Sequence, residues 1–168
     1  MVTMNVARSL RHLTSGRLSV RRAFPAETLK AIEQAIRRSE AAHEGEIVFV
    51  VEAALDTLSL VGGQTARERA LEVFAQRRIW DTERNNGVLI YVLIADRAVE
   101  IVADRGIHQR AGDRAWQEIC RQTEEAFRRG DYRGGSLAAI DGVGRHLTAH
   151  FDSAAPGPNE LPDEPIVR

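Results

Sequence analysis

Two polar stretches of this chain contain side chains that could bind a cation together. The first stretch, residues 80–87, includes Asp81, Thr82, Glu83, Asn85 and Asn86. The second, residues 104–113, includes Asp104, Arg105, His108 and Asp113. Carboxylate and carboxamide oxygens are the ligands that hard cations such as Ca²⁺ and Mg²⁺ prefer. Whether this chemistry is available depends on whether the fold brings the two stretches together.

Three short apolar runs predict the strands that position these stretches. They span residues 46–52, 88–94 and 99–103 and are rich in β-branched side chains. Only a short turn separates the second run from the third, so these two strands should form an antiparallel hairpin. The connection from the first run to the second is long enough to hold a helix, so that pair can be parallel with a crossover.

The hairpin brings the two polar stretches to one edge of the sheet, because the entry to its first strand lies beside the exit from its second. We therefore predict a site for Ca²⁺ or Mg²⁺ at this edge, with the ligands Thr82, Asn86, Asp104 and Asp113. The neighbouring side chains that could contact a ligand are Trp80, Arg105 and His108. Simpler roles compete, since Asp113 is favoured as a cap of the following helix and Trp80 as a lid over the core.

Apolar residues at helical spacing predict helices before, between and after the strands. One helix begins near Pro25, and another follows Thr65 with Ala70, Leu71, Val73 and Phe74 toward the core. Two more cover residues 116–127 and 137–151. The predicted fold class is α/β, with a small mixed sheet of three or four strands sandwiched by helices.

Composition divides the chain into three parts. Residues 1–19 form a basic segment, residues 20–151 the folded α/β domain, and residues 152–168 a flexible tail that contains four prolines. The formal net charge is only -1, which argues against binding to nucleic acid. Cys120 is the only cysteine, so no internal disulfide can form. No secretory signal and no membrane-spanning run are recognisable, so we expect a cytoplasmic protein.

The basic segment can be drawn as an amphipathic helix. Its apolar side comprises Val6, Leu10, Leu13 and Leu18, opposite the basic residues Arg8, Arg11 and Arg17. Such a helix could make peripheral contact with an anionic membrane or bind an acidic partner. Packing on the domain's own surface is the favoured alternative, because the apolar side is narrow.

Signatures of familiar enzymes are missing from the sequence. It has no P-loop and no His-Glu-x-x-His zinc motif, and Gly142-Val-Gly144 lacks the third glycine of a dinucleotide fingerprint. No serine, cysteine or histidine constellation identifies a nucleophile. We therefore assign no catalytic residue.

Three segments of the chain form a recognisable set of motifs: Trp80-Asp-Thr-Glu-Arg-Asn-Asn-Gly-Val-Leu-Ile-Tyr-Val, Val99-Glu-Ile-Val-Ala-Asp-Arg-Gly-Ile and Trp116-Gln-Glu-Ile. Together they closely resemble the TPM domain family. The resemblance covers residues 20–151, and the chain is similar to the short, single-domain bacterial branch without a signal peptide or membrane anchor. It implies a small α/β sandwich, and longer members are associated with acid phosphatase activity, calcium binding and photosystem maintenance.

The chain departs from those longer members after the third strand. Where they have Gly-x-Gly followed by an acidic residue, this sequence has Asp104-Arg-Gly-Ile-His108. The positions that align with the family's motif region are Asp104, Gly106 and Asp113, together with Thr82 and Asn86 on the preceding loop.

Two function hypotheses follow. The leading one is an accessory module that binds a divalent cation and a protein partner related to the cell envelope. The alternative is a metal-assisted phosphomonoester hydrolase, in which the acidic residues hold the metal while Arg105 or Arg114 binds phosphate.

Overall fold

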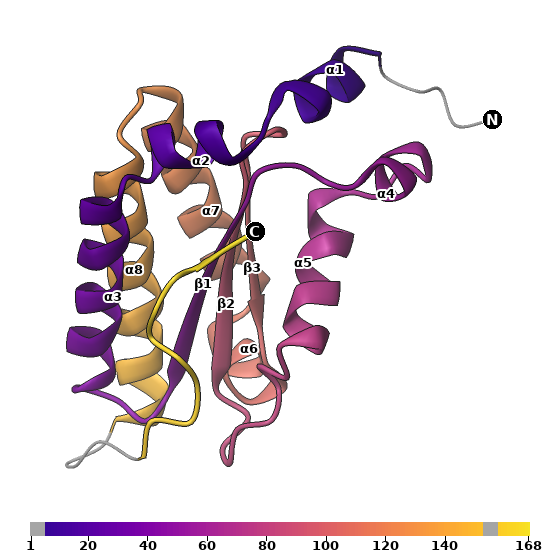
Figure 1. Ribbon diagram of the computed structural model, residues 1–168. Helices are drawn as coiled ribbons and strands as arrows, with labels where there is room; N and C mark the ends of the chain where they lie inside the picture. The colour runs from indigo at the N-terminus through magenta and orange to yellow at the C-terminus, as the bar shows by residue number, and fades with distance from the viewer. Residues whose placement is uncertain (1–5, 153–157) are drawn as a thin grey trace.

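The computed structural model describes residues 6–152 and 158–168 (Figure 1). The helices of this part of the chain are α1 (Val6–Thr14), α2 (Arg17–Ala23), α3 (Ala26–Glu40), α4 (Thr57–Val61), α5 (Ala66–Gln76), α6 (Arg105–Ala111), α7 (Asp113–Arg128) and α8 (Tyr132–Phe151). The strands are β1 (Glu46–Glu52), β2 (Gly87–Leu93), β3 (Ala98–Ala103) and β4 (Ile166–Val167).

The strands form one mixed sheet in the order β3-β2-β1-β4. β1 and β2 are parallel, whereas β2 and β3 are antiparallel with Ile90 opposite Ile101. The predicted parallel crossover and hairpin are therefore confirmed, as is the α/β fold class. The three predicted strands begin and end within one residue of the observed ones.

Helices cover both faces of the sheet, which explains why β1 and β2 read as uninterrupted apolar runs (Figure 1). On one face, side chains such as Phe49 and Ile90 pack against α2, α3, α7 and α8. On the other face, Val50 and Leu89 pack against α5. Each residue of these two strands is buried.

Composition predicted a flexible or loosely docked Pro-containing tail, and in the structure residues 158–168 are docked beside β1. Ile166 and Val167 extend the sheet as β4, parallel to β1. The Glu46 carboxylate accepts hydrogen bonds from the backbone N–H groups of Glu160 (3.2 Å) and Leu161 (3.1 Å). These bonds, together with the packing of Leu161 and Ile166 on the core, hold residues 158–168 against the domain. Residues 153–157 of the predicted tail lie outside the described residues.

Two local expectations were wrong. The second polar stretch, residues 104–113, for which no helix was predicted, contains the short helix α6, because Asp104 caps its first turn. Leu71 of α5 is 46% exposed rather than in the core. The α5 start is as predicted: Thr65 and Glu68 form a reciprocal capping box.

The N-terminal helix packs on the domain, but through its polar side. Arg8 and His12 of α1 both contact Asp96 in the turn between β2 and β3. Val6, Leu10 and Leu13 remain exposed. Within the described residues, no helix combines the length and the hydropathy needed to cross a bilayer.

Candidate functional site

The structure places the two polar stretches side by side at one sheet edge, at the bottom of Figure 1. The N–H of Asp104 donates to the carbonyl of Gly87 over 2.9 Å, which joins the exit of β3 to the entry of β2. Gly106 packs so tightly on the preceding loop that a Cβ there would lie 2.5 Å from the Asn85 carbonyl oxygen and 2.9 Å from that of Arg84. A side chain at position 106 would push the two stretches apart.

Asp104 is the buried carboxylate of this edge, with 6% of the residue exposed. Its Oδ1 accepts a 2.7 Å hydrogen bond from the N–H of Arg105 and so caps α6. Its Oδ2 is buried and has no hydrogen-bond partner among the described residues. A buried acceptor of this kind is costly unless something binds it.

Thr82 and Asn86 organise the loop before β2, and both are buried. The Thr82 hydroxyl accepts the Asn86 N–H at 3.1 Å, and the Asn86 side-chain amide donates to the Glu44 carbonyl at 2.9 Å. These bonds tie the loop to the start of β1. Asn86 Oδ1 is a second buried oxygen without a partner in the described part of the chain.

Asp113 and His108 lie apart from these buried oxygens, on the surface. Asp113 is the first residue of α7, and its side chain is 77% exposed. Its Oδ1 lies 3.4 Å from His108 Nε2. The expected role of Asp113 as a cap was wrong, because Gly112 stands at the cap position with φ +79° and no side-chain cap bond forms.

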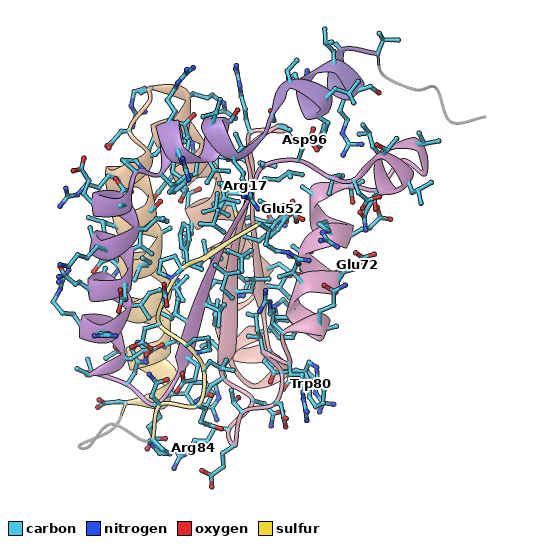
Figure 2. The ribbon with its side chains drawn as sticks, in the orientation of Figure 1. Arg17, Glu52, Glu72, Trp80, Arg84 and Asp96 are labelled. Carbon is cyan, nitrogen blue, oxygen red and sulfur yellow. The ribbon has the colours of Figure 1, made fainter. Side chains whose placement is uncertain are left out.

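Trp80 and Arg105 are two further exposed members of the predicted set. Trp80 is 48% exposed and therefore is not a closed lid over the core, and the Arg78 guanidinium lies 5.8 Å from its ring centroid. Figure 2 shows Trp80 and Arg84 at the same end of the molecule. Arg105, the first residue of α6, is exposed beside the buried Asp104.

The donor set fits a hard cation in part. Asp104 and Asn86 each offer a buried oxygen without a partner, and the Arg84 and Asn85 carbonyls line the same loop. Among residues 6–152 and 158–168, however, no three His, Cys, Asp or Glu side chains are grouped so that they could hold a metal. Any cation here would therefore depend on carboxamide, backbone and water oxygens as well as one carboxylate.

The sequence did not reveal a cluster of acidic side chains that lies next to this edge. Glu40 and Glu46 line a cavity of ≈ 250 Å³, together with Asp163 of the tail. Burial raises the pKa of Glu40 to about 9. A hydrogen bond from the Ile47 N–H opposes this shift, and the charges of Glu46 and Asp163 add to it. Burial likewise raises the pKa of Glu46. The available signal was a charged residue at the start of an otherwise apolar strand.

A second missed group lies at the other end of β1. Glu52 accepts hydrogen bonds from Arg69 and from the Tyr91 hydroxyl, the latter at 2.6 Å. Here too the sequence signal was a glutamate that ends an apolar run, but its partners come from α5 and β2 and could not be identified from spacing.

Comparison with known proteins identifies relatives of this fold. The TPM domain family matches the chain over residues 21–146. The chain is similar to the solved BA42 protein from the psychrophilic bacterium Bizionia argentinensis, at 29% identity and a TM-score of 0.72, over 86% of this chain and 95% of that one. It also shares the fold of the N-terminal domain of a protein from P. gingivalis, at 18% identity and a TM-score of 0.61, over 76% and 80% of the two chains. No curated protein sequence matches the chain.

Proposed function

This chain belongs to the TPM domain family, and we propose that it is an accessory module that binds a divalent cation and a protein partner at its loop edge. The edge comprises residues 80–87 and 104–113. The observation that carries the proposal is the buried Asp104 carboxylate, whose Oδ2 has no partner in the described part of the chain. A cation would neutralise this carboxylate and satisfy its free oxygen.

Calcium suits this edge better than magnesium. Mg²⁺ requires a near-ideal octahedron, whereas Ca²⁺ accepts irregular sets of six to eight oxygens that include backbone carbonyls. Asp104 and Asn86 would each offer a buried side-chain oxygen to such a set, and the carbonyls of Arg84 and Asn85, which lie against Gly106, are candidates to complete it. With few carboxylates the affinity should be weak, with a Kd on the order of 10⁻⁴–10⁻³ M.

Thr82 and Asp113 have different roles in this proposal. Thr82 holds the loop through its bond to Asn86 and keeps an oxygen lone pair for the cation. Asp113 lies at the surface beside His108 and would join the site as an outer ligand, directly or through water.

Calcium titration should raise the melting temperature of the protein by about 3–5 °C at tenfold excess over Kd, because binding adds about 1.4 kcal/mol to the folded state. Mg²⁺ should have a smaller effect. The Asp104→Asn variant should lose the shift, and Asp113→Asn should reduce it. Differential scanning calorimetry with added CaCl₂ or MgCl₂ measures both.

The matched control is Asp141→Asn on α8, which removes an exposed aspartate paired with Arg145. This variant should keep the full calcium shift. The cation proposal fails if the unmodified protein shows no shift at millimolar calcium, or if Asp104→Asn keeps the same shift.

The partner would dock where Trp80 is exposed beside the cation edge. Half-exposed tryptophan and arginine side chains are enriched at the energetic centres of protein interfaces. Trp80, Arg84 and Arg105 present such side chains at this end of the molecule. By the family relationship we expect the partner to be a component related to the cell envelope.

A phosphomonoester hydrolase at the same edge is the second candidate. The observation that favours it is Arg105, which is exposed at the start of α6 next to Asp104 and could bind a phosphate oxygen. Metal-dependent release of nitrophenol from p-nitrophenyl phosphate, lost in Asp104→Asn and in Arg105→Gln, would establish this activity. A calcium-stabilised protein without such turnover would support the accessory module alone.

A further inference from the structure

The end of the molecule opposite the loop edge exposes a group of apolar side chains. Six of the nine large apolar residues that are exposed in the described part of the chain lie here: Val6, Leu10 and Leu13 on α1, Leu18 on α2, and Leu58 and Val61 on α4. We call these six residues the apolar end. In Figure 1, α1 and α4 project together at the top, whereas α6 lies at the bottom.

A partly buried ion pair between Arg8 and Asp96 holds α1 in place. The Arg8 guanidinium donates to both oxygens of Asp96 at 2.8–3.1 Å, and to the Gln64 carbonyl at 2.7 Å. Burial alone would raise the pKa of Asp96, but hydrogen bonds from Arg8 and His12 outweigh burial and lower it. Asp96 lies below α1 in Figure 2. The helix is therefore anchored by a charged contact and not by its apolar side.

His12 adds a second anchor on the same side of α1. It is 4% exposed, and its Nε2 lies 2.9 Å from Asp96 Oδ1. Its Nδ1 accepts the Leu55 N–H at 3.0 Å. Because Leu55 precedes α4 and Gln64 follows it, these contacts also place α4 beside α1.

The orientation of α1 is the reverse of that of an ordinary surface helix. Val6, Leu10 and Leu13 recur every three or four residues and share one side, opposite Arg8 and His12. Since the polar side is bound to the domain, the apolar side faces outward: Val6 is 73%, Leu10 61% and Leu13 74% exposed. An apolar helix side held outward in this way marks an interaction surface.

Arginines are frequent on α1 and α2. Residues 6–26 contain five arginines and neither Asp nor Glu. Arg17, Arg21 and Arg22 are exposed, and the side chain of Arg11 is 48% exposed. Two exposed acids flank α4: the Asp56 carboxylate is bonded to Ser59 at its start, and the Glu68 carboxylate is bonded to Thr65 at the start of α5.

We propose that the apolar end binds the surface of an anionic lipid bilayer. Leucine and valine side chains next to exposed arginines are the combination that interfacial helices use, since the apolar groups enter the acyl boundary and the guanidinium groups contact lipid phosphates. A second copy is a poorer occupant. A two-fold interface would place the arginines of one copy against those of the other.

Membrane binding in this orientation has a consequence for the rest of the molecule. With α1 and α4 at the lipid, the loop edge that contains Asp104 points away from the bilayer (Figure 1). Trp80 then stays accessible to a soluble partner. The inference does not depend on cation binding, and the two can be tested separately.

The test is sedimentation of the full chain with vesicles of equal parts phosphatidylcholine and phosphatidylglycerol, and with vesicles of phosphatidylcholine alone. We expect binding to the first and at least roughly tenfold weaker binding to the second. The variant Leu10→Ser/Leu13→Ser should weaken binding to anionic vesicles by roughly tenfold or more, because it removes apolar area from the lipid contact. Arg21→Gln/Arg22→Gln should weaken it by about fivefold per arginine.

Leu71→Ser on α5 is the matched control, since Leu71 is also exposed but lies outside the apolar end. It should bind vesicles like the unmodified protein, and circular dichroism should show that all the variants are folded. Failure of the unmodified protein to bind anionic vesicles would overturn the proposal, as would equal binding by Leu10→Ser/Leu13→Ser. A dimer in sedimentation velocity that this variant abolishes, without vesicle binding, would assign the surface to a second copy instead.

Discussion

Replacing Arg69 by alanine should lower the free energy of unfolding by about 3 kcal/mol. Arg69 of α5 donates to both oxygens of Glu52 at 2.9 Å, and Tyr91 donates to one of them. Glu52 is only 7% exposed, so removal of Arg69 leaves a buried carboxylate without its counter-charge. Urea denaturation monitored by tryptophan fluorescence measures the loss.

The pH dependence of this loss has a defined sign. Burial alone would raise the pKa of Glu52, but hydrogen bonds from Arg69 and Tyr91 outweigh burial and lower it. The lowered pKa contributes stability above the unfolded pKa of Glu52, and this contribution disappears as the pH falls through the folded value. The difference between Arg69→Ala and the unmodified protein should therefore be largest at neutral pH and shrink in acid.

Arg121→Ala is the control for this prediction. Arg121 also bonds two carboxylates, those of Glu118 and Glu125, but all three side chains are exposed on α7. Its removal should change stability very little, because exposed pairs are screened by water. If Arg69→Ala were no more destabilising than Arg121→Ala, the buried pair would have no special role.

Replacing Glu40 by glutamine should stabilise the protein at alkaline pH. Burial raises the pKa of Glu40 to about 9, so the folded protein keeps a proton on this carboxyl group that the unfolded chain releases near pH 4.5. The stability of the unmodified protein should consequently fall by on the order of 4 kcal/mol between about pH 5 and about pH 8.5. Glutamine keeps an acceptor for Ile47 N–H and a donor toward Asp163 without titrating.

Urea denaturation across this pH range measures the effect. The fall in the free energy of unfolding with rising pH should be less steep in Glu40→Gln than in the unmodified protein. Part of the pH dependence should remain in the variant, because the pKa of Glu46 is also raised. Glu33→Gln on the same helix, which removes only a half-exposed pair with Arg37, should leave the slope unchanged. Equal slopes in Glu40→Gln and the unmodified protein would show that Glu40 is ionised in the fold.

Much of the fold was predictable because it depends on short-range pattern. The apolar runs at β1 and β2 reflect burial on both faces, and the short turn to β3 permits only a hairpin. Thr65 and Glu68 mark the start of α5 by a capping box that operates within one helical turn. These signals involve residues close together in the chain, so a single sequence is enough to recognise them.

The candidate edge was predictable in outline but not in detail. The hairpin topology placed residues 80–87 beside residues 104–113, as the bond from Asp104 N–H to Gly87 confirms. It did not reveal that Asp104 is buried while Asp113 is exposed. Burial of a polar side chain depends on how neighbouring elements pack, and α6 was not anticipated.

The sequence by itself determined β1, β2 and β3, most of the helices, the mixed topology and the family, because periodicity, capping and motif order act over a few residues. Only the tertiary structure decided how α1 and residues 158–168 pack on the domain. Arg8 reaches Asp96 across 88 positions, and Glu46 holds Glu160 across 114. The first contact turns the apolar side of α1 outward, and the second docks the tail beside β1. Such pairings depend on which distant charged residues the packed core brings together. They cannot be predicted from the spacing of residues along the chain.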